Sequence, residues 1–304
     1  MSNYIIGIDG GGTKTLGVLF DLAGNEIKRH QVGFSNFSID EEKAKENIIN
    51  LLKHLTAKLK KSSKAFVQLG IAGTSKLSNP QQFLNQIETK FNCRADLKTD
   101  AYIALQAVKR KEALPVILAI GGTGSVIMTD YGEKINMIGG WGHILGDYGS
   151  AYHLVIEAIK NIISEFENQK KLSLLSKHLL KIMNIESNRY KITEYVYNKD
   201  KSSLAKLSKE IQEIAIDDSY AKSLLIKEGN WLAEQIINAY KLYIKKGPVL
   251  VALRGSFALK ALYVKETIIE KVNENIKDVH FDIDGPEPVY GAYIQAKKYL
   301  LREI

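Results

Sequence analysis

Cysteine is almost absent from this chain of 304 residues, which contains only Cys93. A single cysteine excludes a disulfide framework and is typical of the reducing cytosol. No apolar run approaches the roughly 18 residues that a membrane-spanning helix needs. The N-terminal segment MSNYIIGIDG also lacks the basic and apolar regions of a signal peptide. We therefore expect a cytoplasmic protein with no membrane partner.

Nucleic-acid-binding motifs are also missing, although the net charge is +8. The densest basic segment, Lys53–Lys64, carries leucines at helical spacing, which is typical of a surface helix with a solvated lysine face. Without an accompanying motif, this charge does not indicate a nucleic-acid partner. The chain is 45% hydrophobic and 25% charged, as in ordinary globular proteins, and its length suits two lobes.

What the chain does contain is a glycine-rich hairpin at Ile5–Phe20, IIGIDGGGTKTLGVLF. Glycines let backbone N–H groups approach a phosphate closely. A threonine hydroxyl and a lysine follow, so the phosphate ligands predicted here are Gly11, Gly12, Thr13 and Lys14. Asp9 ends the first strand, where its carboxylate is placed to hold Mg²⁺ through water.

Two familiar glycine loops do not fit this segment. A Walker loop requires lysine directly after its last glycine, but Thr13 follows Gly12. A dinucleotide-binding loop requires a helix after the glycines. Here Thr15–Phe20 is rich in β-forming residues, and the turn-prone Asp21–Asn25 follows. The glycines therefore join two antiparallel strands.

A second segment of the same kind is Pro115–Tyr131, PVILAIGGTGSVIMTDY. It reads as strand, glycine turn and strand, with Gly122, Thr123 and Gly124 as the phosphate ligands. The two copies predict an internal duplication with one phosphate loop in each half. We expect the two turns to clamp the phosphates of one nucleotide from both sides of a cleft.

At this point the chain resembles the sugar-kinase, heat-shock-chaperone and actin superfamily of ATPases. Within it, the chain is similar to the N-acetylglucosamine kinase branch, which also holds the BadF/BadG-type ATPases. The resemblance implies a two-lobed, actin-like α/β fold, a duplicated ribonuclease H-like unit with an active-site cleft between the lobes. The matching segments are Gly7–Thr15, Ser35-Asn36, Gly70–Gly73, Thr99–Ala101, Ile120–Ser125, Gly139–Tyr152 and Gly291–Ala296.

The expected domains are an N-terminal lobe at 1–112 and a C-terminal lobe at 113–287, with a crossing at Lys109–Glu112. The resemblance implies that the last helix, 288–304, returns to the first lobe. Residues 151–245 lack proline and have helical apolar spacing. The other elements expected are strands at Glu26–Val32, Ala65–Ala72, Ala95–Thr99 and Val249–Leu253, and helices from Asp40 to about Lys61, near Pro80–Phe91 and at Ala101–Val108.

Asp100 lies where a strand ends and a helix begins. From the sequence alone it is equally well explained as a helix N-cap or as a carboxylate pointing into a cleft. Phosphoryl transfer to a hydroxyl needs a carboxylate that accepts the hydroxyl proton. The resemblance implies that Asp100 is this general base.

The segment Gly139–Tyr152 carries the second carboxylate, Asp147, between glycines. The resemblance assigns Asp147 to sugar binding; an Asx-turn that stabilises the loop is the alternative. Trp141 and His143 line the sugar pocket in this interpretation, together with Gly140 and Gly142. A tryptophan buried in the core of the lobe is the alternative for Trp141.

Three further sugar contacts and one nucleotide contact rest on the resemblance. Asn36 matches an asparagine that contacts the sugar, although Ser-Asn is also a common turn pair. Gly73 and Thr74 fall where the family contacts the acceptor. Gly255 and Ser256 match the loop beside the adenosine. Arg254 replaces a residue that is often small or apolar, and it either contacts the nucleotide or faces solvent.

These features predict an ATP- and Mg²⁺-dependent kinase that phosphorylates the 6-hydroxyl of N-acetylglucosamine, with a homodimer implied by the family. A dual kinase for N-acetylmuramic acid and N-acetylglucosamine, serving cell-wall recycling, is the alternative, as is a glucosamine or glucose kinase. BadF-like activators ligate an iron–sulfur cluster, which needs at least two cysteines per chain. The non-enzyme alternative is a sugar-sensing regulator that binds ATP, and Asp100 favours catalysis over it.

Overall fold

The computed structural model describes residues 4–60, 63–108, 114–131 and 134–301. The chain divides into two compact units, one comprising Met1–Arg110 with Asp284–Ile304 and the other comprising Lys111–Ile283. The predicted crossing at Lys109–Glu112 lies outside the described residues. Within the described ranges, none of the helices has the length and apolar character that crossing a bilayer demands.

The first unit is built on a five-stranded sheet in the order β3-β2-β1-β4-β5. The pairs β1–β2 and β2–β3 are antiparallel, whereas β1–β4 and β4–β5 are parallel. The carboxyl ends of β1, β4 and β5 therefore lie along one edge. The strands are β1 Tyr4–Gly10, β2 Thr15–Asp21, β3 Glu26–Val32, β4 Ala65–Ile71 and β5 Cys93–Lys98.

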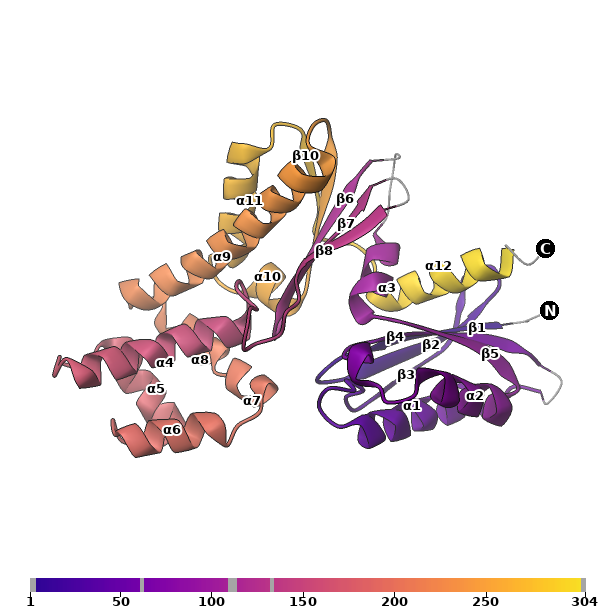
Figure 1. Ribbon diagram of the computed structural model, residues 1–304, viewed down its shortest axis with the longest axis horizontal. Helices are drawn as coiled ribbons and strands as arrows, with labels where there is room; N and C mark the ends of the chain where they lie inside the picture. The colour runs from indigo at the N-terminus through magenta and orange to yellow at the C-terminus, as the bar shows by residue number, and fades with distance from the viewer. Residues whose placement is uncertain (1–3, 61–62, 109–113, 132–133, 302–304) are drawn as a thin grey trace. The chain divides into compact units, whose positions relative to one another are not determined.

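Two pairs of helices cover the two faces of this sheet (Figure 1). The helices α1 (Glu41–Thr56) and α2 (Pro80–Phe91) lie on one face, and α3 (Asp100–Ala107) and α12 (Pro288–Leu301) lie on the other. A 3₁₀ turn at Thr74–Lys76 follows β4. Helix α1 ends at Thr56 rather than near Lys61; the Thr56 hydroxyl bonds back to the Leu52 carbonyl.

The contact between α3 and α12 depends on glycine. A Cβ at Gly291 would lie 1.8 Å from the carbonyl oxygen of Ile103, and one at Gly70 would lie 2.1 Å from the Ile103 Cδ1 atom. No side chain fits at Gly291, so the backbones of α12 and α3 approach each other directly, and Gly70 in β4 leaves room for the side chain of Ile103. This packing fixes α3, whose first residue is Asp100, over the sheet.

The second unit repeats the same sheet, in the order β10-β9-β6-β7-β8. Strand β6 takes the place of β1, with antiparallel β6–β7 and β7–β8 pairs and parallel β6–β9 and β9–β10 pairs. The predicted duplicated α/β fold is thereby confirmed. The strands are β6 Val116–Gly121, β7 Ser125–Tyr131, β8 Lys134–Gly139, β9 Val249–Arg254 and β10 Val279–Asp282.

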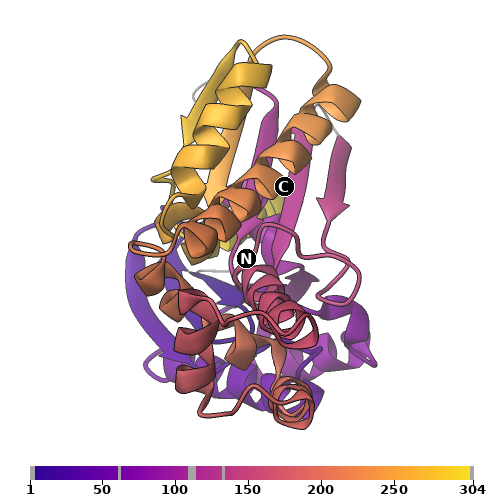
Figure 2. The same cartoon turned by 90° about the vertical axis from the view of Figure 1, so that its left-hand side faces the viewer.

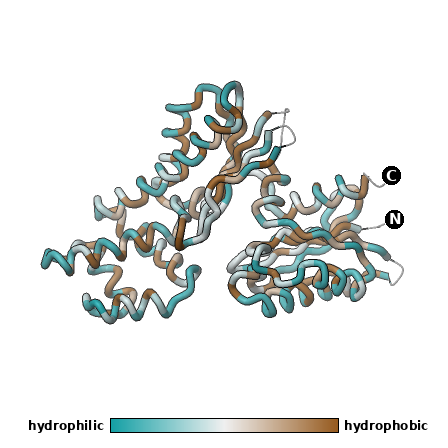
Figure 3. Tube along the Cα trace, viewed as in Figure 1, coloured by the Kyte–Doolittle hydropathy of each residue, from teal (hydrophilic) through white to brown (hydrophobic). Residues whose placement is uncertain are grey.

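The chain between β8 and β9, and after β9, is largely helical. Helices α9 and α11 run side by side, in orange and gold (Figure 2). In both units the central strands are largely hydrophobic, and polar residues gather on the outer turns of the helices (Figure 3). The helices are α4 Ala151–Glu167, α5 Leu174–Met183, α6 Arg189–Tyr197, α7 Lys201–Ala205, α8 Ser208–Ile214, α9 Ser219–Ala239 with a π-helical end at Tyr240–Ile244, α10 Ser256–Lys260 and α11 Val264–Asn275.

Candidate functional site

At the carboxyl edge of the first sheet, three chain segments are held together by backbone hydrogen bonds. Ser35 N donates to the carbonyl of Gly11 at 3.1 Å, and Ala72 N donates to the carbonyl of Gly10 at 2.8 Å. Phe37 N in turn donates to the Ala72 carbonyl at 3.2 Å. The first glycine turn, the loop 33–38 and the segment after β4 therefore form one rigid edge.

The first glycine turn, Gly11–Lys14, connects β1 to β2 where Gly10 pairs with Thr15. Gly11 N donates to the Lys14 carbonyl at 3.1 Å. The Thr15 hydroxyl is buried between Ser35 Oγ at 2.6 Å and the Gly33 carbonyl at 2.8 Å. By contrast, the side chains of Thr13 and Lys14 are exposed. The predicted phosphate ligands thus lie together in one exposed turn, and the buried Thr15 hydroxyl fixes the position of that turn.

Asn36 and Gly73, both predicted to contact a sugar, lie against each other. Gly73 has φ +72°, and a Cβ there would lie 2.3 Å from Asn36 Oδ1. That oxygen accepts a hydrogen bond from Ser38 N at 2.8 Å, so Asn36 also forms the turn that its Ser-Asn pair suggested. Thr74 begins the 3₁₀ turn that follows.

Asp100 is the first residue of α3, but it is not the N-cap. Thr99 is the cap, and its hydroxyl accepts a hydrogen bond from Tyr102 N at 3.1 Å. The N-cap interpretation of Asp100 is therefore wrong, and its carboxylate remains available for another role. Burial raises the pKa of Asp100, and the backbone N–H groups of Ala101 and Asp100 partly oppose that rise.

Asp9 lies in a cluster of negative charge. Burial, with the nearby charges of Asp100 and Glu287, raises its pKa to about 7, although Lys14 partly opposes the rise. A carboxylate in this environment favours a nearby cation. Among the residues that the structure describes, no three His, Cys, Asp or Glu side chains could hold a metal ion directly. The donor set fits Mg²⁺ bound mainly through water.

The second glycine turn connects β6 to β7 where Gly121 pairs with Ser125. Gly122 N donates to the Gly124 carbonyl at 2.9 Å. The start of α4 bonds to this turn as well, because Ala151 N donates to the Gly122 carbonyl at 3.0 Å and Tyr152 N to the Thr123 carbonyl at 3.3 Å. The second turn is thus held by the helix that follows the Gly139–Tyr152 segment.

Asp147 points at this second turn. It is 4% exposed and has φ +66°. Its Oδ1 accepts a hydrogen bond from Ser125 N at 3.2 Å, and its Oδ2 lies 2.6 Å from Lys201 Nζ. A Cβ at Gly124 would lie within 3 Å of both carboxylate oxygens. Asp147 therefore bonds a distant strand instead of forming the Asx-turn considered as its alternative.

The remainder of this loop is solvent-facing. Trp141 is 74% exposed, so the alternative of a core tryptophan is wrong. Ile144 and Leu145 are exposed as well. The edge of the His143 ring meets the Tyr152 ring, with centroids 5.1 Å apart. Gly140 and Gly142 both have positive φ and let the loop fold back on itself.

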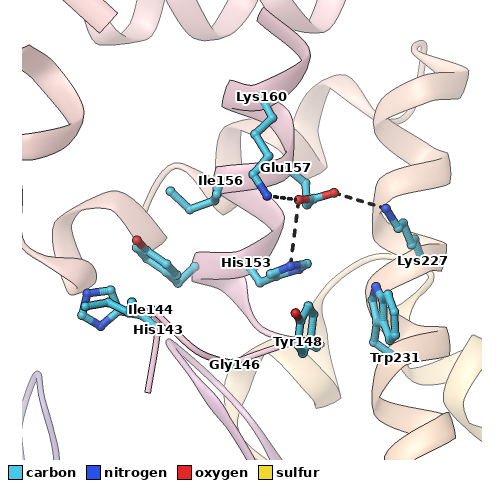
Figure 4. A pocket seen from close by; sticks show the side chains of 11 residues that line it. His143, Ile144, Gly146, Tyr148, His153, Ile156, Glu157, Lys160, Lys227 and Trp231 are labelled. Carbon is cyan, nitrogen blue, oxygen red and sulfur yellow. Dashed lines mark hydrogen bonds and ion pairs between the residues drawn. The ribbon is translucent and has the colours of Figure 1, made fainter. Parts of the chain in front are cut away.

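A cavity of about 260 Å³ lies behind this loop, between α4 and α9 (Figure 4). His153, which lines the cavity, contacts the fully buried Glu228 through Nδ1 at 2.7 Å, and Gly149 N donates a hydrogen bond to Glu228 at the same distance. Glu157 pairs with Lys160 at 2.8 Å and Lys227 at 3.2 Å. The lining residues are His143, Ile144, Gly146, Tyr148, Tyr152, His153, Ile156, Glu157, Lys160, Lys227 and Trp231.

Sequence reasoning missed Glu228 and Lys201. Glu228 carried a signal, because it occupies the apolar stripe of α9 formed by Leu224, Leu225 and Leu232. A charged residue at such a position is buried and requires partners. Lys201 carried no such signal, since it lies in a lysine-rich helical region without a distinctive motif.

Gly255 lies directly against the second turn. It has φ +88°, and a Cβ there would lie 2.4 Å from the Gly121 carbonyl oxygen. Ser256 begins α10. Arg254 is buried, and its guanidinium bonds to the Asp282 carboxylate at 2.8 Å and to the Asp282 carbonyl at 2.9 Å. Of the two alternatives for Arg254, exposure to solvent is therefore wrong. Its side chain instead connects β9 to β10.

The chain is similar to characterised kinases along nearly its whole length. It is 25% identical to an N-acetylmuramic acid/N-acetylglucosamine kinase of Clostridium acetobutylicum, over 97% of this chain and 98% of that protein. It is 24% identical to an N-acetyl-D-glucosamine kinase of Dictyostelium discoideum, over 96% of this chain and 97% of that protein.

Its fold matches that of a solved structure from Chromobacterium violaceum, a protein provisionally described as an N-acetylglucosamine kinase. The TM-score is 0.77 at 21% identity, and the match covers 97% of this chain and 99% of the other. The model of the BadF/BadG/BcrA/BcrD ATPase family matches residues 6–296. This range contains both glycine turns, Asp100 and Asp147. The chain belongs to the BadF/BadG/BcrA/BcrD ATPase family.

Proposed function

We propose that this protein is an ATP- and Mg²⁺-dependent kinase that transfers a phosphoryl group to the 6-hydroxyl of N-acetylglucosamine. The observation that carries the proposal is Asp100, a partly buried carboxylate at the start of α3, where Thr99 and not Asp100 caps the helix. It stands at the same sheet edge as the open first glycine turn. The names of the two curated relatives support the choice of an amino sugar.

In this proposal Asp100 accepts the proton of the sugar hydroxyl as its oxygen attacks the γ-phosphorus. The raised pKa of Asp100 strengthens it as a base. Thr13, Lys14 and the backbone N–H groups of Gly11 and Gly12 hold phosphate oxygens, and Gly122, Thr123 and Gly124 do the same from the second unit. Mg²⁺, when bound through water at Asp9, would neutralise charge on the phosphates.

The acceptor is oriented by polar groups from both units. Asn36, Gly73 and Thr74 belong to the rigid edge of the first sheet. Asp147 accepts hydrogen bonds from sugar hydroxyls, and Gly140–His143 line the pocket. The exposed ring of Trp141 can pack against the apolar face of a pyranose. Gly255 and Ser256 lie beside the adenosine in this assignment.

N-acetylmuramic acid is the second acceptor to test, because the Clostridium relative is named for both sugars. Glucosamine and glucose differ from these acceptors by one substituent and complete the comparison. Cytoplasmic location, a homodimer and a role in cell-wall recycling belong to the same proposal. An iron–sulfur activator is disfavoured, since burial raises the pKa of the lone Cys93 thiol to about 12.

The test is ADP release from Mg-ATP with each of the four sugars, in the wild type and in Asp100→Asn. Loss of a general base lowers kcat about 100- to 10,000-fold, whereas ATP affinity measured by calorimetry should stay the same. Thr99→Ser keeps the helix cap and serves as the matched control. An unchanged rate in Asp100→Asn would contradict the assignment of the base. ADP release that does not depend on sugar would instead indicate a simple ATPase.

A further inference from the structure

Lys201 and Asp147 form an ion pair directly over the second glycine turn. Lys201 Nζ lies 2.6 Å from Asp147 Oδ2. A Cβ at Gly124 would lie 2.5 Å from Lys201 Nζ and 2.8 Å from Asp147 Oδ1. Glycine therefore leaves the space that the ammonium and the carboxylate occupy over the turn, and a larger residue would displace them. Lys201 belongs to none of the motifs that identify the family.

The lysine is presented by a short helix that is itself well anchored. Asp200 caps α7, because its carboxylate accepts hydrogen bonds from Ser203 N at 2.9 Å and from Ser203 Oγ at 2.7 Å. Leu204 and Ala205 are buried, and α7 packs against α4. Lys201 is the first residue after the cap, so its backbone position is fixed. The packing of α7 therefore places Lys201 beside Asp147, so the contact does not depend on a freely moving surface side chain.

Asp147 depends on such a partner. A buried ionised carboxylate is costly unless it is paired and hydrogen-bonded. Its positive φ is also rare for a residue with a Cβ, so the backbone directs the side chain toward the turn. Within the ranges that the structure describes, Ser125 is the one residue whose backbone N–H donates to it. The ammonium of Lys201 supplies the remaining compensation.

The pair leaves Asp147 able to bind a ligand. An ionised carboxylate has about four acceptor positions. Ser125 N occupies one on Oδ1, whereas Lys201 Nζ is an ion-pair partner of Oδ2, which accepts no hydrogen bond from the described residues. Acceptor positions therefore remain for the hydroxyl groups of a sugar.

We propose that Lys201 is a positioning residue of the sugar site, which pairs with the Asp147 carboxylate and orients it so that its remaining lone pairs accept hydrogen bonds from the acceptor hydroxyls. This role rests on the proposed kinase function and on the assignment of Asp147 to the sugar. It identifies α7, a part of the helical insertion between β8 and β9, as an element that governs acceptor affinity. A cation near a glycine turn could also serve phosphate, and the kinetic constants separate the two roles.

The experiment compares Lys201→Met with Lys206→Met, an exposed lysine at the other end of the same helix. Loss of a hydrogen bond to a charged group corresponds to an increase of about 10- to 100-fold in the KM for the sugar. The KM for Mg-ATP should stay within about twofold of the wild type, as should kcat, since only the binding of the sugar is affected. Lys201→Arg should recover most of the affinity, because it keeps the charge. Lys206→Met should behave like the wild type.

A double-mutant cycle tests whether Lys201 acts through Asp147. In an Asp147→Asn background, Lys201→Met should change the KM for the sugar by less than about twofold, since the charge that it serves is gone. This double variant also leaves no buried charge unpaired. It therefore provides the comparison with Asp147→Asn even if Lys201→Met alone does not fold.

Three results would overturn the role of Lys201 while the kinase function stands. They are a sugar KM equal to that of Lys206→Met, an increase in the KM for Mg-ATP instead, and full additivity with Asp147→Asn. Absence of sugar-dependent turnover in the wild type is a different result. It would overturn the proposed function itself, and the role of Lys201 with it.

Discussion

The two glycine turns occupy equivalent places in the two sheets, yet they obtain their charged groups differently. Gly10 pairs with Thr15 across the first turn, and Gly121 pairs with Ser125 across the second. The first turn carries its own carboxylate and lysine, Asp9 and Lys14. In the second turn, Ile120 occupies the position equivalent to Asp9, directly before the paired glycine.

The second turn takes its carboxylate and its lysine from distant segments, Asp147 from the loop before α4 and Lys201 from α7. These two groups neutralise each other. Asp9, in contrast, lies near Asp100 and Glu287, and its pKa is raised. The two turns thus share their place in the sheet but differ in length and in the source of their charged groups. In our proposal the first turn binds a cation and the carboxylate beside the second binds a neutral ligand.

Removal of the carboxylate from the first turn should have the largest effect. Asp9→Asn is expected to lower kcat/KM about 100-fold, the upper range for residues that hold a metal through its outer shell. The Mg²⁺ concentration required for half-maximal activity should rise in parallel. Ile120→Val, at the equivalent position of the second turn, should stay within about twofold of the wild type. Steady-state kinetics over a Mg²⁺ titration checks both, and equal losses in the two variants would contradict the asymmetry.

The space above each turn gives a second comparison, which is measured as stability. In Gly124→Ala, the new methyl group would meet Lys201 Nζ and both Asp147 oxygens within 3 Å. In Gly11→Ala, the nearest atom would lie 3.9 Å away, at the Lys14 carbonyl. We expect Gly124→Ala to destabilise the protein by about 1–3 kcal/mol, the usual cost of overpacking. Gly11→Ala should be nearly neutral in urea unfolding. Similar losses in both variants would show that the second turn is no more crowded than the first.

Much of the fold could be predicted because its determinants are local. Each glycine turn and its strands are adjacent in sequence, which fixes their register. Helix α2 matches its predicted bounds, since Asn79 caps it, Pro80 begins it and the left-handed Asn92 follows it. Helix α1 was predicted too long, because its lysine-rich continuation looked helical but has little apolar surface to bury.

The candidate site was predictable only in part, since charge partners and exposure depend on tertiary structure. Residue type gave no means to decide whether Trp141 is buried, and the structure exposes it. The sequence left open whether Arg254 contacts the nucleotide or faces solvent, because β10, which brings Asp282 beside it, comes later in the chain. Lys201 meets Asp147 only through the docking of α7 on α4. These contacts join residues that are far apart in the sequence, so the spacing of residues along the chain does not predict them.

The smallest expected effect is a pH-dependent change in stability caused by Asp9, measured without Mg²⁺. In the unfolded chain the pKa of Asp9 is near its ordinary value of 3.8, whereas in the folded protein it is raised to about 7. Between these values the folded protein holds a proton that the unfolded chain has released. Stability contributed by this group therefore falls as the pH rises from about 4 to 7 and stays low above that range.

Asp9→Asn removes this penalty, so its Tm should exceed that of the wild type at pH 8 by about 2–4 °C, with a smaller gain at pH 5. Thermal unfolding in EDTA at the two pH values measures the difference. Asp147→Asn is the matched variant from the second turn, and it should lose stability, because the charge of Lys201 then has no partner. If Asp9→Asn gave the same gain at pH 5 as at pH 8, the effect would not come from ionisation. The carboxylate of the first turn would then be as well compensated by its surroundings as that of the second, and the cation site at Asp9 would have no electrostatic basis.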